Sequence, residues 1–207
     1  MSRKAGRSPS ETRRLLLDAA GTMIRTRGVS ATLDDIAQRA GVSKGGLIYH
    51  FASKDDLIRA LADDLLQTFR DAVEAACDPA DTAPGRLARA YVRACLDTGQ
   101  DERVLRESIA LLAQLITIPA VAELARADAE RWDRELQADG LPEDVLALVV
   151  SAADGASNAS LWGGATVAAK LRRLEQQLIQ LTLDHTLWSH LRLTSNPDVP
   201  GGSGGFD

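Results

Sequence analysis

Apolar residues along the chain recur three and four positions apart, which is the spacing of one face of an α-helix. Four such stretches precede Pro79, and glycine or serine residues separate them. Beyond Pro79 the same spacing predicts helices over about 83–98, 101–117, 119–139, 142–162 and 166–191, with breaks at glycine or proline. Because no alternating β pattern of useful length occurs, the sequence predicts an all-α fold.

The segment GVSKG at residues 41–45 has two possible interpretations. It matches the Gly-x-Ser-x-Gly pattern of serine hydrolases, in which a strand leads into the turn that carries the nucleophile. Residues 33–40, however, have the apolar repeat of a helix, and Thr32 is placed to cap it. Gly41 can end that helix and Ser43 can cap the next one. The sequence therefore predicts a helix-turn-helix and not a catalytic serine.

Further helices are predicted on both sides of this unit. Ser8 and Glu11 have the spacing of a capping box, with Pro9 at the first helical position. Downstream, Ser53 precedes a long amphipathic helix that runs towards Pro79. We expect the first turn of this long helix to be part of the helix-turn-helix unit and its later turns to pack into the rest of the chain.

The residues from Leu16 to Leu57 are similar to the DNA-binding domain of the TetR-type transcriptional regulators, through the segments LLDAA, IAQRAGVSKGGLIYHF and SKDDL. The resemblance implies a three-helix DNA-binding domain followed by a helical domain for ligand binding and dimerisation. It also implies a repressor that binds an inverted-repeat operator as a homodimer and is released by a small-molecule effector. The family usually has tyrosine at the position of Ile48, so this chain lacks one expected polar DNA contact. It usually has phenylalanine at the position of Ile24, where isoleucine exchanges one core residue for another.

The expected organisation has five parts. A basic arm at 1–7, which could enter a DNA groove or be simply disordered, precedes the helix-turn-helix domain at 8–53. A connecting helix at 54–78 leads to an effector-binding and dimerisation domain at 79–193. The remaining residues, 194–207, are rich in Gly, Pro and Ser and are expected to be a disordered tail.

Charge is distributed unevenly between these parts. Residues 1–59 contain 11 Lys and Arg against 6 Asp and Glu, whereas the remainder contains 13 against 23. A basic segment on an acidic protein is typical of a confined nucleic-acid surface, because basic residues release the counterions of the phosphate backbone. The distribution supports double-stranded DNA as the partner of the helix-turn-helix.

The second helix of the pair is the candidate recognition helix, whose first turn meets base edges in the major groove. Leu47, Ile48 and Phe51 are expected to supply its core contacts. Lys44 can donate to guanine or to phosphate, and two adjacent glycines could serve close approach to DNA or packing against Ala20. Side chains suited to phosphate oxygens and a capping threonine complete the predicted DNA-binding set: Thr32, Ser43, Lys44, Gly45, Gly46, Tyr49, His50 and Lys54.

The helix predicted at 166–191 carries two apolar rows, one at heptad-like spacing and one through Ile179, Leu183 and Leu187. One row can face the protomer and the other a partner. The preceding helix is rich in small residues, which permit close helix approach. Both helices resemble the family's two-helix dimerisation element, and the predicted interface comprises Ala152, Gly155, Ala159, Leu171, Leu174, Leu178 and Leu181.

The effector is harder to predict, because aromatic residues make up only 4% of the chain. Asp154 lies on an apolar helix and needs a partner, which could be a cationic effector or an arginine across the dimer. The candidate ligand-binding residues are the rare aromatic side chains and nearby polar ones: Tyr91, Ser108, Gln114, Trp132, Asn158 and Trp162.

Other classes of protein are disfavoured. The three histidines do not form a metal-ligand pattern, and we expect no metal, no cofactor and no catalytic residues. The longest charge-free apolar stretch, Ser108 to Ala122, has 15 residues, fewer than the ~20 of a membrane span. We therefore expect a cytoplasmic protein without a membrane partner. The alternatives are a dimeric DNA-binding protein without a small-molecule ligand and a helical structural protein.

Overall fold

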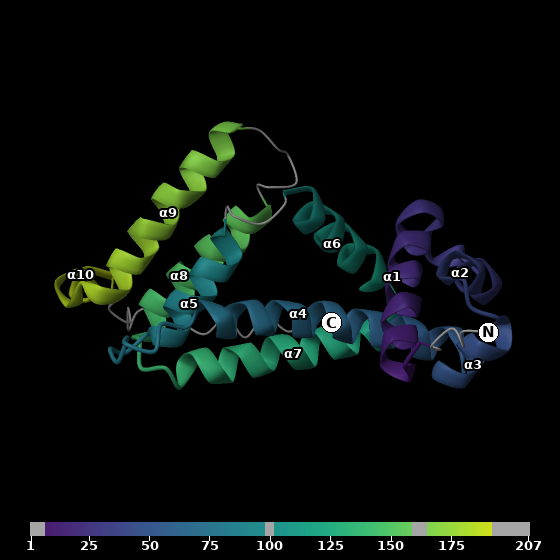
Figure 1. The fold of residues 1–207 in the computed structure, drawn as a ribbon. Helices are drawn as coiled ribbons and strands as arrows, with labels where there is room; N and C mark the ends of the chain where they lie inside the picture. Colours follow the sequence, from purple (N-terminus) through teal and green to yellow (C-terminus); the bar gives the residue numbers. More distant parts are fainter. Residues whose placement is uncertain (1–6, 98–101, 159–164, 192–207) are drawn as a thin grey trace, which may run out of the picture.

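The computed structural model of the protein describes residues 7–97, 102–158 and 165–191. All regular elements in these ranges are helical (Figure 1), as the apolar spacing predicts. They are α1 (Pro9–Arg27), the short 3₁₀ helix η1 (Gly28–Ser30), α2 (Leu33–Ala40), α3 (Lys44–His50), α4 (Lys54–Ala76), α5 (Arg86–Leu96), α6 (Glu102–Leu115), α7 (Pro119–Gln137), α8 (Glu143–Ser157), α9 (Ala165–Leu183) and α10 (His185–Leu191).

The first four α-helices begin at side-chain caps. Ser8 and Glu11 form the expected capping box at α1, in which the Glu11 carboxylate accepts from the Ser8 amide at 2.7 Å. Thr32 forms a second capping box at α2, and Ser53 caps α4 by accepting from the amide of Asp56. Each cap satisfies an amide that has no partner within its own helix. The predicted starts of these helices are confirmed.

The turn between α2 and α3 excludes the hydrolase interpretation of GVSKG. Gly41 has φ +65°, in the left-handed region, and its amide donates to the carbonyl of Gln38 at 3.2 Å. Ser43 Oγ then accepts from the amide of Gly46 at 3.1 Å. A helix, not a strand, leads into this turn, so the serine caps a helix and is not raised above a sheet.

Helix α4 connects two separate hydrophobic cores. Its first half places Leu57 and Leu61 in the core of the N-terminal helices, and its second half places Val73 in the core of α5, α8 and α9. Arg70 holds the middle of α4 to α7, since its guanidinium lies 2.7 Å from Asp128 Oδ1 and 2.9 Å from Glu135 Oε2. The prediction that this helix belongs to both parts of the chain is confirmed.

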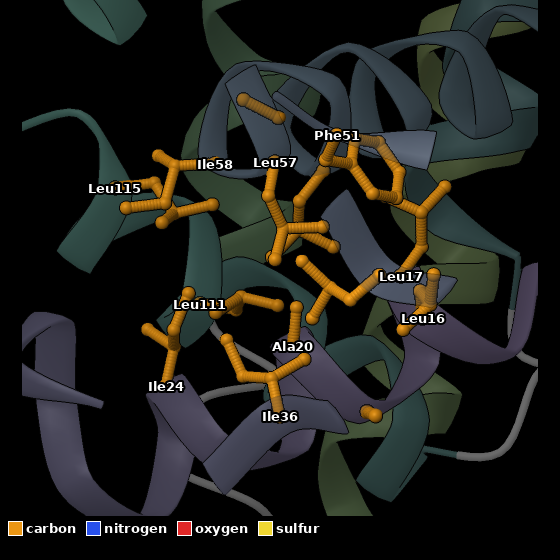
Figure 2. Close-up of a cluster of buried hydrophobic side chains, with 14 of the residues drawn as sticks. Leu16, Leu17, Ala20, Ile24, Ile36, Phe51, Leu57, Ile58, Leu111 and Leu115 are labelled. Carbon is orange, nitrogen blue, oxygen red and sulfur yellow. The ribbon is translucent and has the colours of Figure 1, made fainter. Parts of the chain in front are cut away.

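The first core is not closed by the N-terminal helices alone. Leu111 and Leu115 of α6 pack among residues of α1, α2 and α4 (Figure 2). Val121 at the start of α7 belongs to the same core. Arg25 of α1 also pairs with Glu107 of α6, with the atoms 3.5 Å apart. The helix-turn-helix unit is therefore packed against two helices of the C-terminal domain.

The second core contains a fully enclosed arginine. Arg89 of α5 is 1% exposed, and its Nε and Nη2 donate to the two carboxylate oxygens of Asp81 at 2.7 Å. Nη1 donates to the Pro84 carbonyl and to Thr182 of α9, and Nη2 also donates to the Ala83 carbonyl. All five donor positions of the guanidinium are thereby used. This arginine fixes the loop before α5 to α9.

The single helix predicted at 166–191 is wrong in one respect, because it breaks at Asp184. The Asp184 side chain accepts from the amide of Thr186 at 3.0 Å and so begins α10. Aspartate competes with helix continuation through such local hydrogen bonds. The turn at the break also lets the indole of Trp188 donate to the carbonyl of Leu181 at 2.9 Å.

Candidate nucleic-acid interface and ligand cavity

Helix α3 is anchored by one face and leaves the other in solvent. Leu47 is 0% exposed and Phe51 is 3% exposed, and their spacing puts them on the same face. Tyr49 is 80% exposed and Ile48 is 41% exposed. The prediction that Ile48 belongs to the core is therefore wrong, because it lies about 100° around the helix from Leu47. The exposed face belongs to a helix that the turn and the core hold in place.

The lysines of the predicted DNA-binding set have partners within the protomer. Lys44 Nζ lies 2.9 Å from Asp34 Oδ2, and the two side chains are 64% and 66% exposed. Lys54 Nζ donates to the carbonyl of Val29 between α1 and α2. An exposed ion pair of this kind contributes little free energy, so Lys44 can exchange Asp34 for a DNA phosphate or another anion at little cost.

Thr32 has a hydrogen-bonding role before any contact with DNA. Its hydroxyl donates to Asp35 Oδ2 at 2.7 Å and accepts from the Asp35 amide at 3.1 Å. The hydrogen bonds from the side chain and amide of Thr32 lower the pKa of Asp35.

The last two residues of α3 are aromatic. The rings of Tyr49 and His50 pack edge to face, with their centroids 5.2 Å apart. Tyr49 is exposed and His50 is half-buried at the end of α3.

The two adjacent glycines have different surroundings. A Cβ at Gly46 would lie 2.8 Å from Val42 Cγ1 and 3.3 Å from Ser43 Oγ, so the packing of the turn favours a glycine there. A Cβ at Gly45 would meet nothing within 4 Å. Packing against Ala20 therefore explains neither residue. Gly45 leaves open space on the exposed side of the first turn of α3, where a base or phosphate could approach.

A cavity of about 290 Å³ lies between α4, α5, α6 and α8. Its wall is largely apolar and includes Leu65 and Phe69 of α4 and Leu112 of α6. Tyr91 and Ser108, two of the predicted ligand-binding residues, line it. Its size lies near the lower end for small-molecule sites. The cavity is adjacent to the first core, since the same turns of α6 place Leu111 and Leu115 there.

The other predicted ligand-binding residues are placed differently. Trp132 packs behind the wall, with its ring centroid 5.3 Å from that of Tyr91 and 5.8 Å from that of Phe69. Gln114 and Asn158 do not line the cavity, and the Asn158 side chain instead donates to the backbone carbonyl of Asp154 at 3.1 Å. Trp162 lies outside the described residues. No sequence signal indicates which polar residues of α6 and α8 face the cavity, because the position of a residue in a helix does not fix how that helix is rotated about its axis.

Asp154 lies at the edge of this cavity with a neutral partner. Its carboxylate accepts from the Tyr91 hydroxyl at 2.7 Å, and the Cys95 thiol lies 4.0 Å away. Burial and the nearby carboxylate raise the pKa of Tyr91 well above its usual value and raise the pKa of Cys95 to about 12. Both groups are therefore neutral near pH 7. The intramolecular partner of Asp154 is a tyrosine, which sequence reasoning missed.

The predicted interface residues of α9 mostly face their own protomer. Leu171 and Leu178 are 8% and 5% exposed within the second core, and Leu174 and Leu181 pack against it. Ala159 lies outside the described residues. On α8, Ala152 is half-buried and Gly155 is exposed.

Three large apolar side chains at this end of the molecule do reach solvent. Leu148 of α8 is 46% exposed, Leu183 at the end of α9 is 43% exposed, and Leu187 of α10 is 44% exposed. Leu148 lies four residues before Ala152 and seven before Gly155, so the three share one stripe of α8. These residues, and not Leu171 and Leu178, are available to a partner.

Among the described residues, no group of three or more His, Cys, Asp or Glu is arranged to hold a metal ion. No single helix there is long and apolar enough to cross a membrane. The consecutive helical segments Arg106–Leu115 and Pro119–Gln137 together have the length and apolar composition of a membrane span, but the chain bends by 119° between them.

The chain is similar to proteins of known type along most of its length. Residues 16–61 match the family model of bacterial regulatory proteins of the tetR family, and residues 85–183 match the tetracyclin repressor-like C-terminal domain. The HTH-type transcriptional repressor KstR2 of Mycobacterium tuberculosis is 40% identical over 90 residues, which is 41% of this chain and 44% of that protein. The chain thus spans less than half the length of the curated relatives it matches.

Solved structures show the same fold. A transcriptional regulator from Rhodococcus sp. Rha1 superimposes with a TM-score of 0.64 at 23% identity, over 86% of this chain and 96% of that one. The multidrug binding protein EbrR, complexed with malachite green, has a TM-score of 0.61 at 23% identity, over 82% of this chain and 97% of that one. With both domains matched in order on a helix-turn-helix fold, the chain belongs to the TetR family of bacterial regulatory proteins.

Proposed function

We propose that this chain is a one-component transcriptional regulator that binds an operator in double-stranded DNA as a homodimer. It acts in the cytoplasm as a repressor and not as an enzyme, and a small-molecule effector releases it. The observation that carries the proposal is the exposed face of α3, where Tyr49 is 80% exposed while Leu47 on the other face is fully buried. A rigid helix with a free polar face, at the basic end of the chain, suits entry into the major groove.

The geometry of α3 supports a specific set of proposed DNA contacts. Lys44 and the open side of Gly45 lie in the first turn, which meets base edges. Tyr49 and His50 follow at the other end of α3 and suit phosphate oxygens. Lys54 and Thr32 contact the backbone, and for Lys54 this requires exchange of the Val29 carbonyl for phosphate.

The salt dependence of binding tests this assignment. Each phosphate or base contact made by a lysine releases about one counterion, so Lys44→Ala should reduce the slope of log affinity against log salt by about 1. It should also relax the preference for one DNA sequence. Lys170→Ala is the matched control, because Lys170 is an exposed lysine of α9. An unchanged slope in Lys44→Ala, or an equal change in the control, would contradict the role of α3.

The homodimer is proposed to form through the exposed stripe of α8 together with Leu183 at the end of α9 and Leu187 of α10. Leu148 and Leu187 are both nearly half exposed, and burial of such side chains against a second copy is favourable. Leu148→Glu should yield a monomer with unchanged helical content that loses operator affinity. Leu178→Glu, by contrast, should unfold the second core, because Leu178 is only 5% exposed. Analytical ultracentrifugation and circular dichroism separate the two results.

Release by an effector is proposed to pass through α6 and α4. Both helices line the cavity, and both also place leucines in the first core beside the helix-turn-helix. A ligand that displaces them changes the position of α3 relative to that of the second copy, and so the fit to two half-sites. By linkage, operator DNA must weaken effector binding by the same factor by which the effector weakens DNA binding. The fold is shared with EbrR, whose structure contains malachite green.

A further inference from the structure

The electrostatics of the cavity are one-sided. Among the described residues that line it, Asp154 is the one Asp, Glu, Lys, Arg or His. Its wall otherwise consists of aliphatic and aromatic side chains, hydroxyls and the neutral thiol of Cys95. Asp154 is an exposed residue, and in the described part of the chain its carboxylate forms no ion pair and accepts from the Tyr91 hydroxyl and the Cys95 thiol. A negative charge without a cationic partner therefore lies at the edge of an apolar space.

Arg70, the basic residue stacked on Trp132, is engaged with other carboxylates. Arg70 lies 4.2 Å from the ring centroid of Trp132, behind the wall, but its guanidinium pairs with Asp128 and Glu135. The sequence stretches 98–101 and 159–164, which lie outside the described residues, contain no Lys, Arg or His.

Aromatic rings surround the same space. Phe69 and Tyr91 both line the cavity, with their ring centroids 5.3 Å apart and their planes at 88°. The faces of aromatic rings attract cations, most strongly where water is excluded. An organic cation in the cavity would therefore lie near a carboxylate and two aromatic rings. An anion would meet the carboxylate without any compensating positive group.

We infer that the effector of this cavity is a lipophilic monocation, an apolar body that carries one protonated amine or similar cationic group. The inference rests on the proposed function, because it assigns a ligand class to the proposed effector site. Asp154 binds the cationic group, and Tyr91 positions the carboxylate through its hydroxyl. Phe69 and the aliphatic side chains of α4 and α6 enclose the apolar body. The site rejects anions and binds neutral analogues more weakly.

Three probes with the same phenylbutyl body test this inference: 4-phenylbutylamine, 4-phenylbutanol and 5-phenylpentanoate, which are a cation, a neutral molecule and an anion at pH 7. Isothermal titration calorimetry on the full chain gives the affinity for each probe. Because a charge-assisted hydrogen bond stabilises a complex more than a neutral one, we expect the amine to bind at least about tenfold more tightly than the alcohol. The anion should bind most weakly.

Variants assign this preference to Asp154. Asp154→Asn keeps an acceptor for the Tyr91 hydroxyl but removes the charge, so the amine should lose about tenfold in affinity while the alcohol is unchanged. Asp154→Glu should retain the preference for the amine. Glu130→Gln is the matched control, because it removes one exposed carboxylate of α7, a helix that does not line the cavity, and it should change nothing.

Several results would overturn the inference. Equal binding of the three probes to the wild type, no binding of the amine at millimolar concentration, or a preference that survives in Asp154→Asn would each do so. An arginine from a second copy that neutralised Asp154 would appear as the first of these results. DNA release is measured separately by fluorescence anisotropy. If the amine binds with the expected dependence on Asp154 but does not release DNA, the ligand class stands and the proposed regulation fails.

Discussion

Truncation of Leu115 tests the link between the two domains. Leu115 is the last residue of α6, lies outside the helix-turn-helix in sequence, and is 0% exposed within the first core. Leu96 is a close match, because it is the last residue of α5 and 0% exposed, but it lies in the second core. Leu115→Ala and Leu96→Ala thus make the same chemical change in two different cores.

The cost of each change follows from burial and position. Truncation of an enclosed leucine removes apolar contacts and leaves a cavity, at a cost of about 2–5 kcal/mol. Because each residue ends its helix, the last helical turn can relax towards the cavity. We therefore expect the free energy of unfolding to fall by about 3 kcal/mol, in the lower part of that range. Most domains unfold with about 5–15 kcal/mol, so both variants should remain folded. Urea denaturation measures the loss for each variant.

Hydrogen exchange then shows which helices lose protection. In Leu115→Ala, amides of α1, α2 and α3 should exchange faster by up to about a hundredfold, since the loss of about 3 kcal/mol lies in their core. In Leu96→Ala the faster exchange should appear in α8 and α9. If Leu115→Ala leaves the exchange of α1 to α3 unchanged, α6 does not stabilise the DNA-binding helices, and the route proposed for effector release is wrong.

Three further outcomes concern charged and ionisable groups. Asp34→Asn should raise DNA affinity about two- to fivefold at low salt, and less at high salt, because it frees Lys44 and removes a negative charge beside it; anisotropy titrations at two salt concentrations measure this. Arg89→Met should destabilise the protein by about 3 kcal/mol, because it leaves the carboxylate of Asp81 without its partner; urea denaturation measures this. Since the arginine lowers the pKa of Asp81, the pair stabilises the protein above the unfolded pKa of about 3.9, and this contribution should fade as the pH falls below that value. Cys95, whose pKa burial raises to about 12, should react with iodoacetamide at pH 8 far more slowly than a free thiol, as followed by mass spectrometry.

Local signals predicted much of the fold. Caps and stop residues act within a few positions along the chain, so Ser8, Thr32, Gly41 and Ser43 set the helix boundaries as expected. The prediction of one continuous helix failed at Asp184. The apolar repeat continues past this residue, but its side chain caps a new helix there. Periodicity marks which residues are apolar, but it does not show whether a helix continues through a polar position.

Contacts between distant parts of the chain could not be predicted in the same way. Periodicity identified Leu171 and Leu178 as one row, but whether that row faces its own protomer or a partner depends on how α9 rotates against α5 and α8. The hydrogen bond from Tyr91 to Asp154 joins residues 63 positions apart, and no local pattern indicates it. The participation of Leu115 in the first core depends likewise on tertiary packing.

Hydroxyl-radical footprinting on the DNA upstream of the chain's own gene tests the central claim most directly. A homodimer that inserts α3 of each protomer into the major groove should protect two patches on one face of the duplex, related by the twofold symmetry of an inverted repeat. The patches should be separated by about one helical turn or a multiple of it, and Tyr49→Ala with Lys44→Ala should abolish them. A footprint that survives in that double variant, or a single patch without a symmetry-related partner, would contradict the account.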